Sequence, residues 1–307
     1  MTVAEAPPTP GLAIHCDRVV LLYPSDEGDV AALRGIDLEV GAGEAISLLG
    51  PSGSGKSSLL ALLAGLVMPS TGRVWLGGQD VAKMTGRELT RMRATSVSLV
   101  LQDPTRNLLP YASSLQNVEF AQKLGASRAK KELRPPAELL AALGLGDIGP
   151  RPAATLSGGE QQRVAIAAGV SLGPDLLLLD EPTNQLDADN RDRVLSSLLA
   201  VNRDLGTTVV CVTHDAAVAA AMPRTVNIRD GMVGAEGRLG RTFAVVSRDG
   251  SIQLPDEVLE VLPPGALVRV ERRTSGAELF RSESSDVAGA DGRGDSGGLD
   301  PTVDQPE

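Results

Sequence analysis

A glycine-rich run at residues 50 to 57 has the composition of a phosphate-binding loop. Glycines let the backbone curl so that successive N–H groups face one anion, and the N-terminus of a following helix adds to the attraction. Lys56 would bring a positive charge to the same oxygens, and the hydroxyl of Ser57 suits Mg²⁺. A chance glycine-rich turn would not account for the apolar strand before the run and the helical segment after it. The run predicts a site for the β- and γ-phosphates of a nucleoside triphosphate, formed by Gly50, Pro51, Ser52, Gly53, Ser54, Gly55, Lys56 and Ser57.

Two acidic residues follow a wholly apolar segment further along the chain. Leu176 to Leu179 predicts a buried strand, and Asp180 and Glu181 come directly after it. Two acids that merely begin a polar loop are the alternative. Beside a phosphate loop, however, Asp180 is expected to hold Mg²⁺ and Glu181 to polarise a water molecule for in-line attack on the γ-phosphate.

One of only two histidines, His214, comes directly after the β-branched segment Thr207 to Thr213. A lone histidine is more often structural than functional. At the carboxyl end of a strand it would lie where a γ-phosphate lies, and it could donate a hydrogen bond to the developing charge. We therefore expect a catalytic role for His214.

A second anion site is predicted where a helix begins at Ser157. Glu160, three residues later, completes a capping box, and Gly158 and Gly159 leave backbone N–H groups of the first turn open to a phosphate. A helix cap alone would not need both glycines.

These residues need strands whose carboxyl ends meet at one edge of a sheet. The chain alternates apolar strand patterns with helical ones, which favours an α/β domain with a mainly parallel sheet. The expected strands are Val19 to Tyr23, Ile36 to Val40, Ala45 to Leu49, Val97 to Leu101, Leu176 to Leu179 and Thr208 to Val212. The expected helices are Ser57 to Leu66, Ser113 to Leu124, Pro135 to Leu143, Gly158 to Val170 and Ala188 to Leu205.

Composition narrows the class of protein. Of the 307 residues, 42% are hydrophobic and 2% aromatic, so the core must be rich in leucine, valine and alanine. The net charge of −10 makes nucleic acid an unlikely partner, and half of it falls in residues 281–307. Two distant cysteines, Cys16 and Cys211, indicate a reducing cytosol rather than a disulfide framework. We see neither a signal-peptide pattern nor an apolar run long enough to span a membrane.

At this point the order of motifs resembles the ATP-binding-cassette ATPases. The order is the phosphate loop, Gln102, Leu-Ser-Gly-Gly-Glu at 156–160, Leu-Leu-Leu-Leu-Asp-Glu at 176–181, and His214. The resemblance covers about residues 11–234 and implies ATP and Mg²⁺ as cofactors. The implied fold class is α/β, a P-loop NTPase of cassette type whose mixed sheet core has an antiparallel β edge and a helical subdomain at about 103–172.

The resemblance also implies roles for residues that the patterns alone do not assign. Tyr23 would stack on adenine, Ser58 would join the ATP-binding residues in place of the usual threonine, and Gln102 would contact Mg²⁺ and the attacking water. In two copies closed face to face, Ser157, Gly158, Gly159 and Glu160 of one copy would contact the nucleotide of the other. Asp187 lies in the loop that crosses between the copies.

Within the family, Asn107-Leu-Leu-Pro and Gly-Glu-Gln-Gln-Arg-Val-Ala-Ile-Ala are similar to the branch that serves lipoprotein release, macrolide export and bacterial cell division. This implies integral membrane permease subunits as partners, a second copy of the chain, and a peripheral location on the cytoplasmic face of the plasma membrane. Ala168-Gly169 and Asn184-Gln185 depart from the common pattern without removing a catalytic group.

The character of the chain changes after residue 234. Asp249-Gly250 between apolar runs signals a hairpin, and residues 237–278 resemble the swapped-hairpin fold of AbrB-type regulators. We expect residues 1–10 to be flexible, 237–278 to form a small β-rich appendage used for dimerisation or regulation, and 279–307 to be a disordered acidic tail.

The leading functional hypothesis is the ATPase subunit of a membrane transporter. A non-transport, mechanically coupled membrane complex of the cell-division type is the alternative. A soluble repair or ribosomal ATPase, and a regulator that binds DNA through the appendage, are less favoured, because the motifs are uninterrupted and single and the appendage lacks a strongly basic surface.

Overall fold

The structure, a computed structural model, describes residues 11–26, 28–125, 133–238, 241–246, 250, 252, 254, 256–263, 265–274 and 276–281. The contacts divide the chain into two compact units, Met1–Gln253 and Leu254–Glu307. The expectation of a flexible N-terminus at 1–10 lies outside the described residues.

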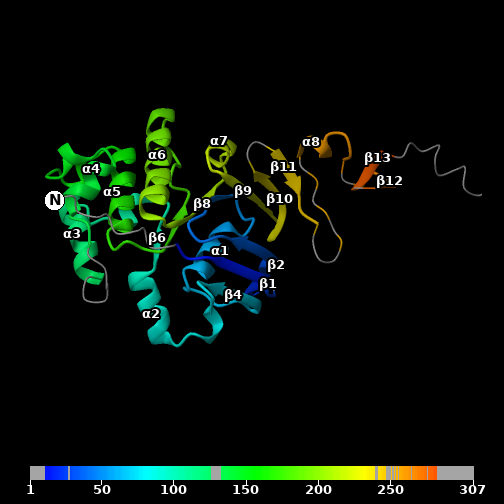
Figure 1. The fold of residues 1–307 in the computed structure, drawn as a ribbon, viewed down its shortest axis with the longest axis horizontal. Coiled ribbons are helices and arrows are strands. Elements are labelled where there is room, and N and C mark those ends of the chain that lie inside the picture. The colour runs from blue at the N-terminus through cyan, green and yellow to red at the C-terminus, as the bar shows by residue number, and fades with distance from the viewer. Residues whose placement is uncertain are drawn as a thin grey trace, which may run out of the picture. The chain divides into compact units, whose positions relative to one another are not determined.

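A seven-stranded sheet forms the centre of the first unit (Figure 1). Its strands in spatial order are β11 (Arg241–Ala244), β10 (Met232–Arg238), β9 (Arg224–Arg229), β3 (Ala45–Leu49), β8 (Thr208–Thr213), β7 (Leu176–Asp180) and β6 (Val97–Val100). The strands from β9 to β6 pair in parallel, and β10 and β11 are antiparallel. The predicted mainly parallel sheet with an antiparallel edge is therefore confirmed.

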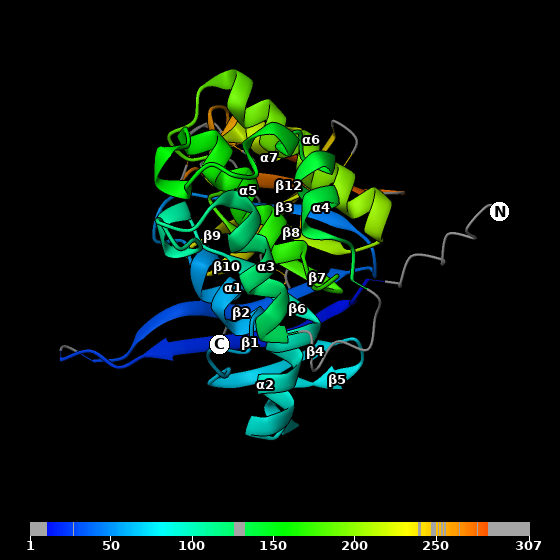
Figure 2. The same cartoon turned by 90° about the vertical axis from the view of Figure 1, so that its left-hand side faces the viewer.

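A second, antiparallel sheet has the order β2 (Val30–Val40), β1 (Ile14–Tyr23), β4 (Thr71–Leu76) and β5 (Gln79–Asp80). The helices of this unit are α1 (Lys56–Leu63), α2 (Gly86–Thr95), α3 (Ser114–Gly125), α4 (Pro136–Ala142), α5 (Gly158–Val170), α6 (Ala188–Leu205) and α7 (Ala216–Ala220). Helices α3, α4 and α5 contact one another, and they lie together away from β1, β2 and β4 (Figure 1). Figure 2 turns this side of the molecule toward the viewer. The sequence patterns did not locate β4, β5, β9, β10, α2 or α7.

The central sheet is covered on both faces, as its apolar strands require. Alternate residues of β7 face different cores. Leu176 and Leu178 join the core that contains α1 and the antiparallel sheet, whereas Leu177 and Leu179 join the core of α3 to α6. All four leucines are fully buried.

The two units divide later in the chain than the sequence suggested. The expected start of the appendage, residue 237, lies within β10, and β11 continues the central sheet by pairing with β10. Residues 237, 238 and 241–244 therefore belong to the sheet. Val246 and Ile252 form an antiparallel bridge. Asp249 of the predicted turn lies outside the described residues.

The second unit contains α8 (Asp256–Leu259) and the antiparallel hairpin β12 (Val268–Arg273) and β13 (Gly276–Arg281). The Arg273 guanidinium lies 3.1 Å from the Glu271 carboxylate and 2.9 Å from that of Glu278. Because β13 runs to Arg281, the first three residues of the expected disordered tail form a strand. Residues 282–307 lie outside the described part of the chain.

A buried guanidinium joins the two sheets of the first unit. Arg224, at the start of β9, is 6% exposed and bonds to the carboxylates of Glu236 at 2.6 Å and Glu44 at 3.2 Å. It also donates to the carbonyl oxygen of Glu39 in β2 at 2.7 Å. Burying this cation costs little only because its three partners are in place.

We predict that Arg224→Leu lowers the free energy of unfolding by about 2–3 kcal/mol, since Glu236 and Glu44 lose their counter-charge in a partly buried site. Urea denaturation would measure the change. Arg203→Leu is the control, because its pair with the neighbouring Asp204 is exposed and worth less than about 1 kcal/mol. Equal effects of the two substitutions would contradict the assignment.

Candidate active site

The predicted phosphate loop joins the end of β3 to the start of α1. Gly55 caps α1 with a φ of 99°, a left-handed conformation that strains other residues. A side chain at Gly50 would collide with the carbonyl oxygen of Ile228, and one at Gly55 with that of Ala32. Glycine at these two positions is therefore a steric requirement of the loop.

The Lys56 side chain folds back over this loop. It is 6% exposed, and its Nζ atom donates to the carbonyl oxygens of Gly50 and Pro51, each at 2.7 Å. Burial lowers the pKa of Lys56, while the charges of Glu181 and Asp180 oppose the shift. The ammonium group is thus held at the loop by backbone oxygens.

Asp180 and Glu181 lie at the end of β7, as predicted. The Ser57 hydroxyl donates to Asp180 Oδ1 at 3.2 Å, which brings the two expected Mg²⁺ ligands together. Burial raises the pKa of the Asp180 carboxyl, although the hydrogen bond from Ser57 opposes this.

Glu181 has an unusual backbone. Its φ of 47° lies in the left-handed region, where a residue with a side chain is strained. Its Oε1 atom is 2.9 Å from Nδ1 of His214, and the His214 backbone N–H donates to Oε2 at 3.4 Å. The fold therefore brings the expected water-polarising acid and the expected histidine into contact.

Most of the predicted site residues line a single pocket of about 370 Å³. Those that line it are Ser52, Gly53, Gly55, Lys56, Ser57, Ser58, Gln102, Asp180, Glu181 and His214. Gly50, Pro51 and Ser54 belong to the loop but do not line the pocket. Ala32 and Asn184 also line it, and sequence reasoning assigned neither to the site. Ala32 has no reactive group to signal a role, and Asn184 was noted only as a departure from the usual pattern.

Two oxygen donors and an amide at this pocket suit a magnesium ion. Mg²⁺ binds through a few protein oxygens and completes its shell with phosphate and water. Ser57 and Asp180 are in contact, and Gln102 lines the same pocket. The residues present therefore fit the ion.

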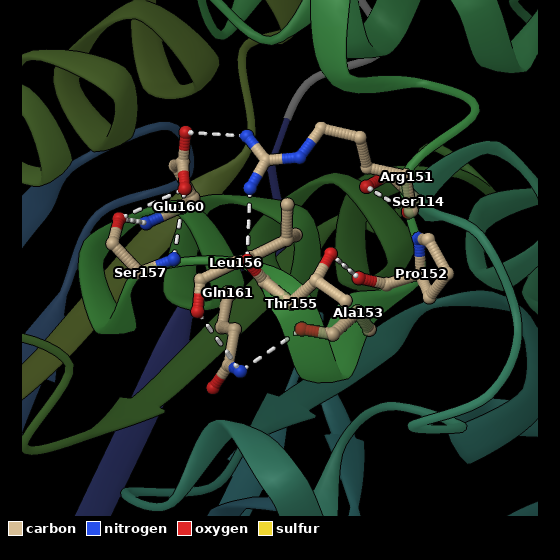
Figure 3. Close-up of polar contacts among 9 residues, drawn as sticks. All are labelled: Ser114, Arg151, Pro152, Ala153, Thr155, Leu156, Ser157, Glu160 and Gln161. Carbon is tan, nitrogen blue, oxygen red and sulfur yellow. Dashed lines mark hydrogen bonds and ion pairs between the residues drawn. The ribbon is translucent and has the colours of Figure 1, made fainter.

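The predicted second anion site does not line this pocket. Ser157 caps α5, and its Oγ accepts from the Glu160 N–H at 3.3 Å while Glu160 Oε2 accepts from the Ser157 N–H at 2.8 Å (Figure 3). This backbone hydrogen bond is the largest of the causes that lower the pKa of Glu160. The predicted capping box is thus confirmed, with Ser157 and Gly158 exposed to solvent.

An arginine holds the turn that precedes this cap. Arg151 donates through Nη2 to the carbonyl oxygen of Thr155 at 2.8 Å, and its Nη1 lies 3.7 Å from Glu160 Oε1 (Figure 3). The Arg151 carbonyl oxygen accepts from the Ser114 N–H at 3.0 Å, so the same residue contacts the start of α3.

Gly159 has a packing role that sequence reasoning missed. A side chain there would collide with Asn190, whose own amide and backbone N–H donate to the Asp187 carboxylate at 2.9 and 2.8 Å. Asp187 thereby caps α6 beside the start of α5. Tyr23 ends β1, is 39% exposed, and does not line the pocket.

Comparison with known proteins supplies the family. The ABC transporter family model matches residues 33–184. A lipoprotein-releasing system ATP-binding protein, LolD 2 of Caulobacter vibrioides, is 44% identical over 211 residues, covering 68% of this chain and 91% of that protein. The chain belongs to the ABC transporter family.

Other ABC proteins agree with this assignment. The macrolide export ATP-binding/permease protein MacB of Rhodopseudomonas palustris is 40% identical over 70% of this chain, but the match covers only 32% of MacB. Among solved structures, the dimeric ABC transporter cassette MJ0796 matches with a TM-score of 0.65 and 33% identity, covering 74% of this chain and 98% of that one. A post-hydrolysis state of MJ0796 bound to ADP and phosphate matches equally well.

The predicted ABC fold and ATPase activity are therefore confirmed, and this ABC protein binds and hydrolyses ATP. The AbrB-like resemblance of 237–278 stays a prediction. In the part of the chain that the structure describes, no helix has both the length and the apolar character needed to cross a membrane.

We predict that Asp180→Asn raises the thermal unfolding midpoint of the nucleotide-free protein by a few degrees and abolishes ATP turnover. The amide removes a charge that burial disfavours, as functional sites often carry such a stability cost. Differential scanning calorimetry and a phosphate-release assay would measure the two effects. As a control, Asp189→Asn removes an exposed charge near the α6 N-terminus and should leave the midpoint unchanged or slightly lower. A lower midpoint for Asp180→Asn would contradict the prediction.

Proposed function

We propose that this chain is the ATP-hydrolysing subunit that powers a separate membrane permease of the kind served by LolD and MacB. The observation that carries the proposal is the similarity over 91% of LolD 2 in a chain whose pocket assembles the phosphate loop, both carboxylates, Gln102 and His214. MacB combines ATP-binding and permease parts, and the chain matches a third of it. We infer that the chain supplies the ATP-binding part.

In one copy, the N–H groups of the loop and Lys56 bind the β- and γ-phosphates. Ser57, Asp180 and Gln102 hold Mg²⁺, and Ser58 and Tyr23 complete the binding of ATP. Bound Mg²⁺ supplies positive charge to the phosphate oxygens. Lys56 exchanges its contacts with Gly50 and Pro51 for phosphate oxygens when the nucleotide enters.

Hydrolysis depends on a positioned water molecule. Glu181 accepts a hydrogen bond from the water and turns its oxygen toward the γ-phosphorus, and His214 donates to the γ-phosphate oxygens as their charge grows. The 2.9 Å contact between His214 and Glu181 supports this pairing, because one side chain orients the other.

The site is completed by a second copy of the chain. Ser157, Gly158 and Gly159 do not line the pocket of their own copy, and Ser157 and Gly158 are exposed. Their N–H groups would donate to the γ-phosphate of the ATP bound by a neighbouring copy. Glu160 would hold the turn in place, and Asp187 would lie at the boundary between the copies. The dimeric state of the similar cassette MJ0796 supports this arrangement.

The segment from Gln102 to Val118 offers a surface for the permease. Tyr111 is 93% exposed and Leu109 is 46% exposed, and both precede α3. Exposed apolar and aromatic side chains that gather on one segment suit a protein partner. We propose a peripheral location on the cytoplasmic face of the membrane, where the permease presents its helices to this segment.

We predict that Glu181→Gln keeps ATP binding but lowers kcat by at least about 100-fold, because the amide polarises the water poorly. ATP should then trap a closed dimer, detectable by size-exclusion chromatography with light scattering. Lys56→Ala, expected to lose ATP binding, should stay monomeric under the same conditions. Normal turnover by the Glu181→Gln protein would refute the assigned role.

The permease can be tested by tagging the chain and identifying the membrane protein that co-purifies from solubilised membranes. We expect a permease, and we expect Tyr111→Asp to reduce its recovery about tenfold, as burying a charge in an apolar contact does. Leu66→Asp, at an apolar residue that is 57% exposed and lies outside this segment, is the control and should retain the permease. If both variants recovered the permease in equal amounts, the contact would lie outside this segment. If only a soluble complex co-purified with the chain, the proposed function would be contradicted.

A further inference from the structure

Gln102 lines the nucleotide pocket, but little holds its own side chain. It is exposed and forms no hydrogen bond to any residue that the structure describes. Gln102 also lies beyond the end of β6 at Val100, so the ladder of the sheet does not fix its backbone. Its position must come from the loop that contains it.

The side chain of Asn107 contacts the backbone on both sides of Gln102. Its Oδ1 atom accepts from the Leu101 N–H at 2.9 Å, and its Nδ2 atom donates to the Leu101 carbonyl oxygen at 2.9 Å. The same Nδ2 atom donates to the Asp103 carbonyl oxygen at 3.0 Å. One carboxamide thus fixes the residue before Gln102 and the residue after it.

The loop gives Asn107 a firm base. Residues 104–106 form one turn of 3₁₀ helix, whose start is capped by the Asp103 carboxylate accepting from the Thr105 N–H at 2.8 Å. The Asn107 N–H donates to the Pro104 carbonyl oxygen at 3.0 Å, and the next residue, Leu108, is buried. Asn107 is therefore fixed by its own backbone and by the core, and its amide can transmit that position to Gln102.

We propose that Asn107 is a positioning residue for Gln102: its carboxamide holds the backbone on either side so that the Gln102 amide meets the nucleotide site. The proposal rests on the role of Gln102 in the proposed function. Asn107 does not line the pocket, so it acts on the reaction only through Gln102. Small displacements of a catalytic group cost rate out of proportion to the binding energy lost.

A double-mutant cycle on the full-length protein tests this. Asn107→Ala should lower kcat for ATP hydrolysis about tenfold while KM for ATP changes less than about twofold, because the phosphate loop is untouched. Gln102→Ala should also lower kcat. The combined variant should be no slower than Gln102→Ala alone, because a positioning residue has nothing left to position.

Asn107→Asp keeps the size and the accepting oxygen but sets a carboxylate against the carbonyl oxygens of Leu101 and Asp103. It should show the same pattern, and it keeps the test informative if the alanine variant folds poorly. Asn202→Asp is the matched control, because the Asn202 amide also bridges two carbonyl oxygens, those of Gly43 and Thr207 at 2.8 Å, away from the pocket. Asn202→Asp should lower the thermal unfolding midpoint without changing kcat, both in the otherwise unmodified protein and in the Gln102→Ala variant.

Several results would overturn the proposal. A normal kcat for both Asn107 variants would do so, as would effects of Asn107→Ala and Gln102→Ala that multiply. Loss of the fold in both variants would make Asn107 a structural residue instead. If Gln102→Ala itself hydrolysed ATP at the normal rate, the positioning role would fall while the ATPase assignment stood, since Glu181 and Lys56 test that assignment independently.

Discussion

Parallel pairing of three strands is the constraint on which the site depends. In the register of the sheet, Leu49 of β3 lies opposite Thr213 of β8, and Asp180 of β7 lies opposite Val212 of β8. The next residues of each strand therefore emerge side by side. A phosphate loop, a carboxylate pair and a histidine that are spread over more than 150 residues of the chain meet at one edge because their strands end in the same place.

Several residues of the site lower the stability of the folded state, and the rest of the fold offsets this loss. Burial disfavours the charges of Lys56 and Asp180, and Glu181 has a strained backbone. The three strands that present these residues, β3, β7 and β8, are buried along almost their whole length. A rigid apolar layer can hold charged groups in positions that burial disfavours.

Away from the strands, side-chain amides and helix caps hold the backbone in place, as ladder hydrogen bonds do within the sheet. Asn107 fixes the loop around Gln102, Arg151 and Glu160 fix the turn at Ser157, and Asn190 joins Asp187 to the surface beside Gly159. These contacts link the exposed segment before α3 to the α5 cap through short polar steps, since the Arg151 carbonyl oxygen also accepts from Ser114.

The sequence alone determined the parts of the site whose structure depends only on residues close in the chain. The phosphate loop, the α5 capping box and the apolar strand that ends in Asp180 each depend on neighbours within about eight residues, so composition and spacing suffice to predict them. Helices α5 and α6 were predicted with the bounds that the structure shows, because their caps are local too.

Only the tertiary structure decided which distant residues meet. The strands β4 and β9 are short and half polar, and they exist because they pair with β1 and β3. Ala32 lines the pocket, Asn107 brackets Gln102, and Gly159 lies against Asn190, yet none of these residues carries a local pattern that indicates its contact. For the same reason the sheet ends at β11, beyond the expected boundary at residue 237. A strand needs a hydrogen-bonded partner strand, and the sequence of a strand does not identify that partner.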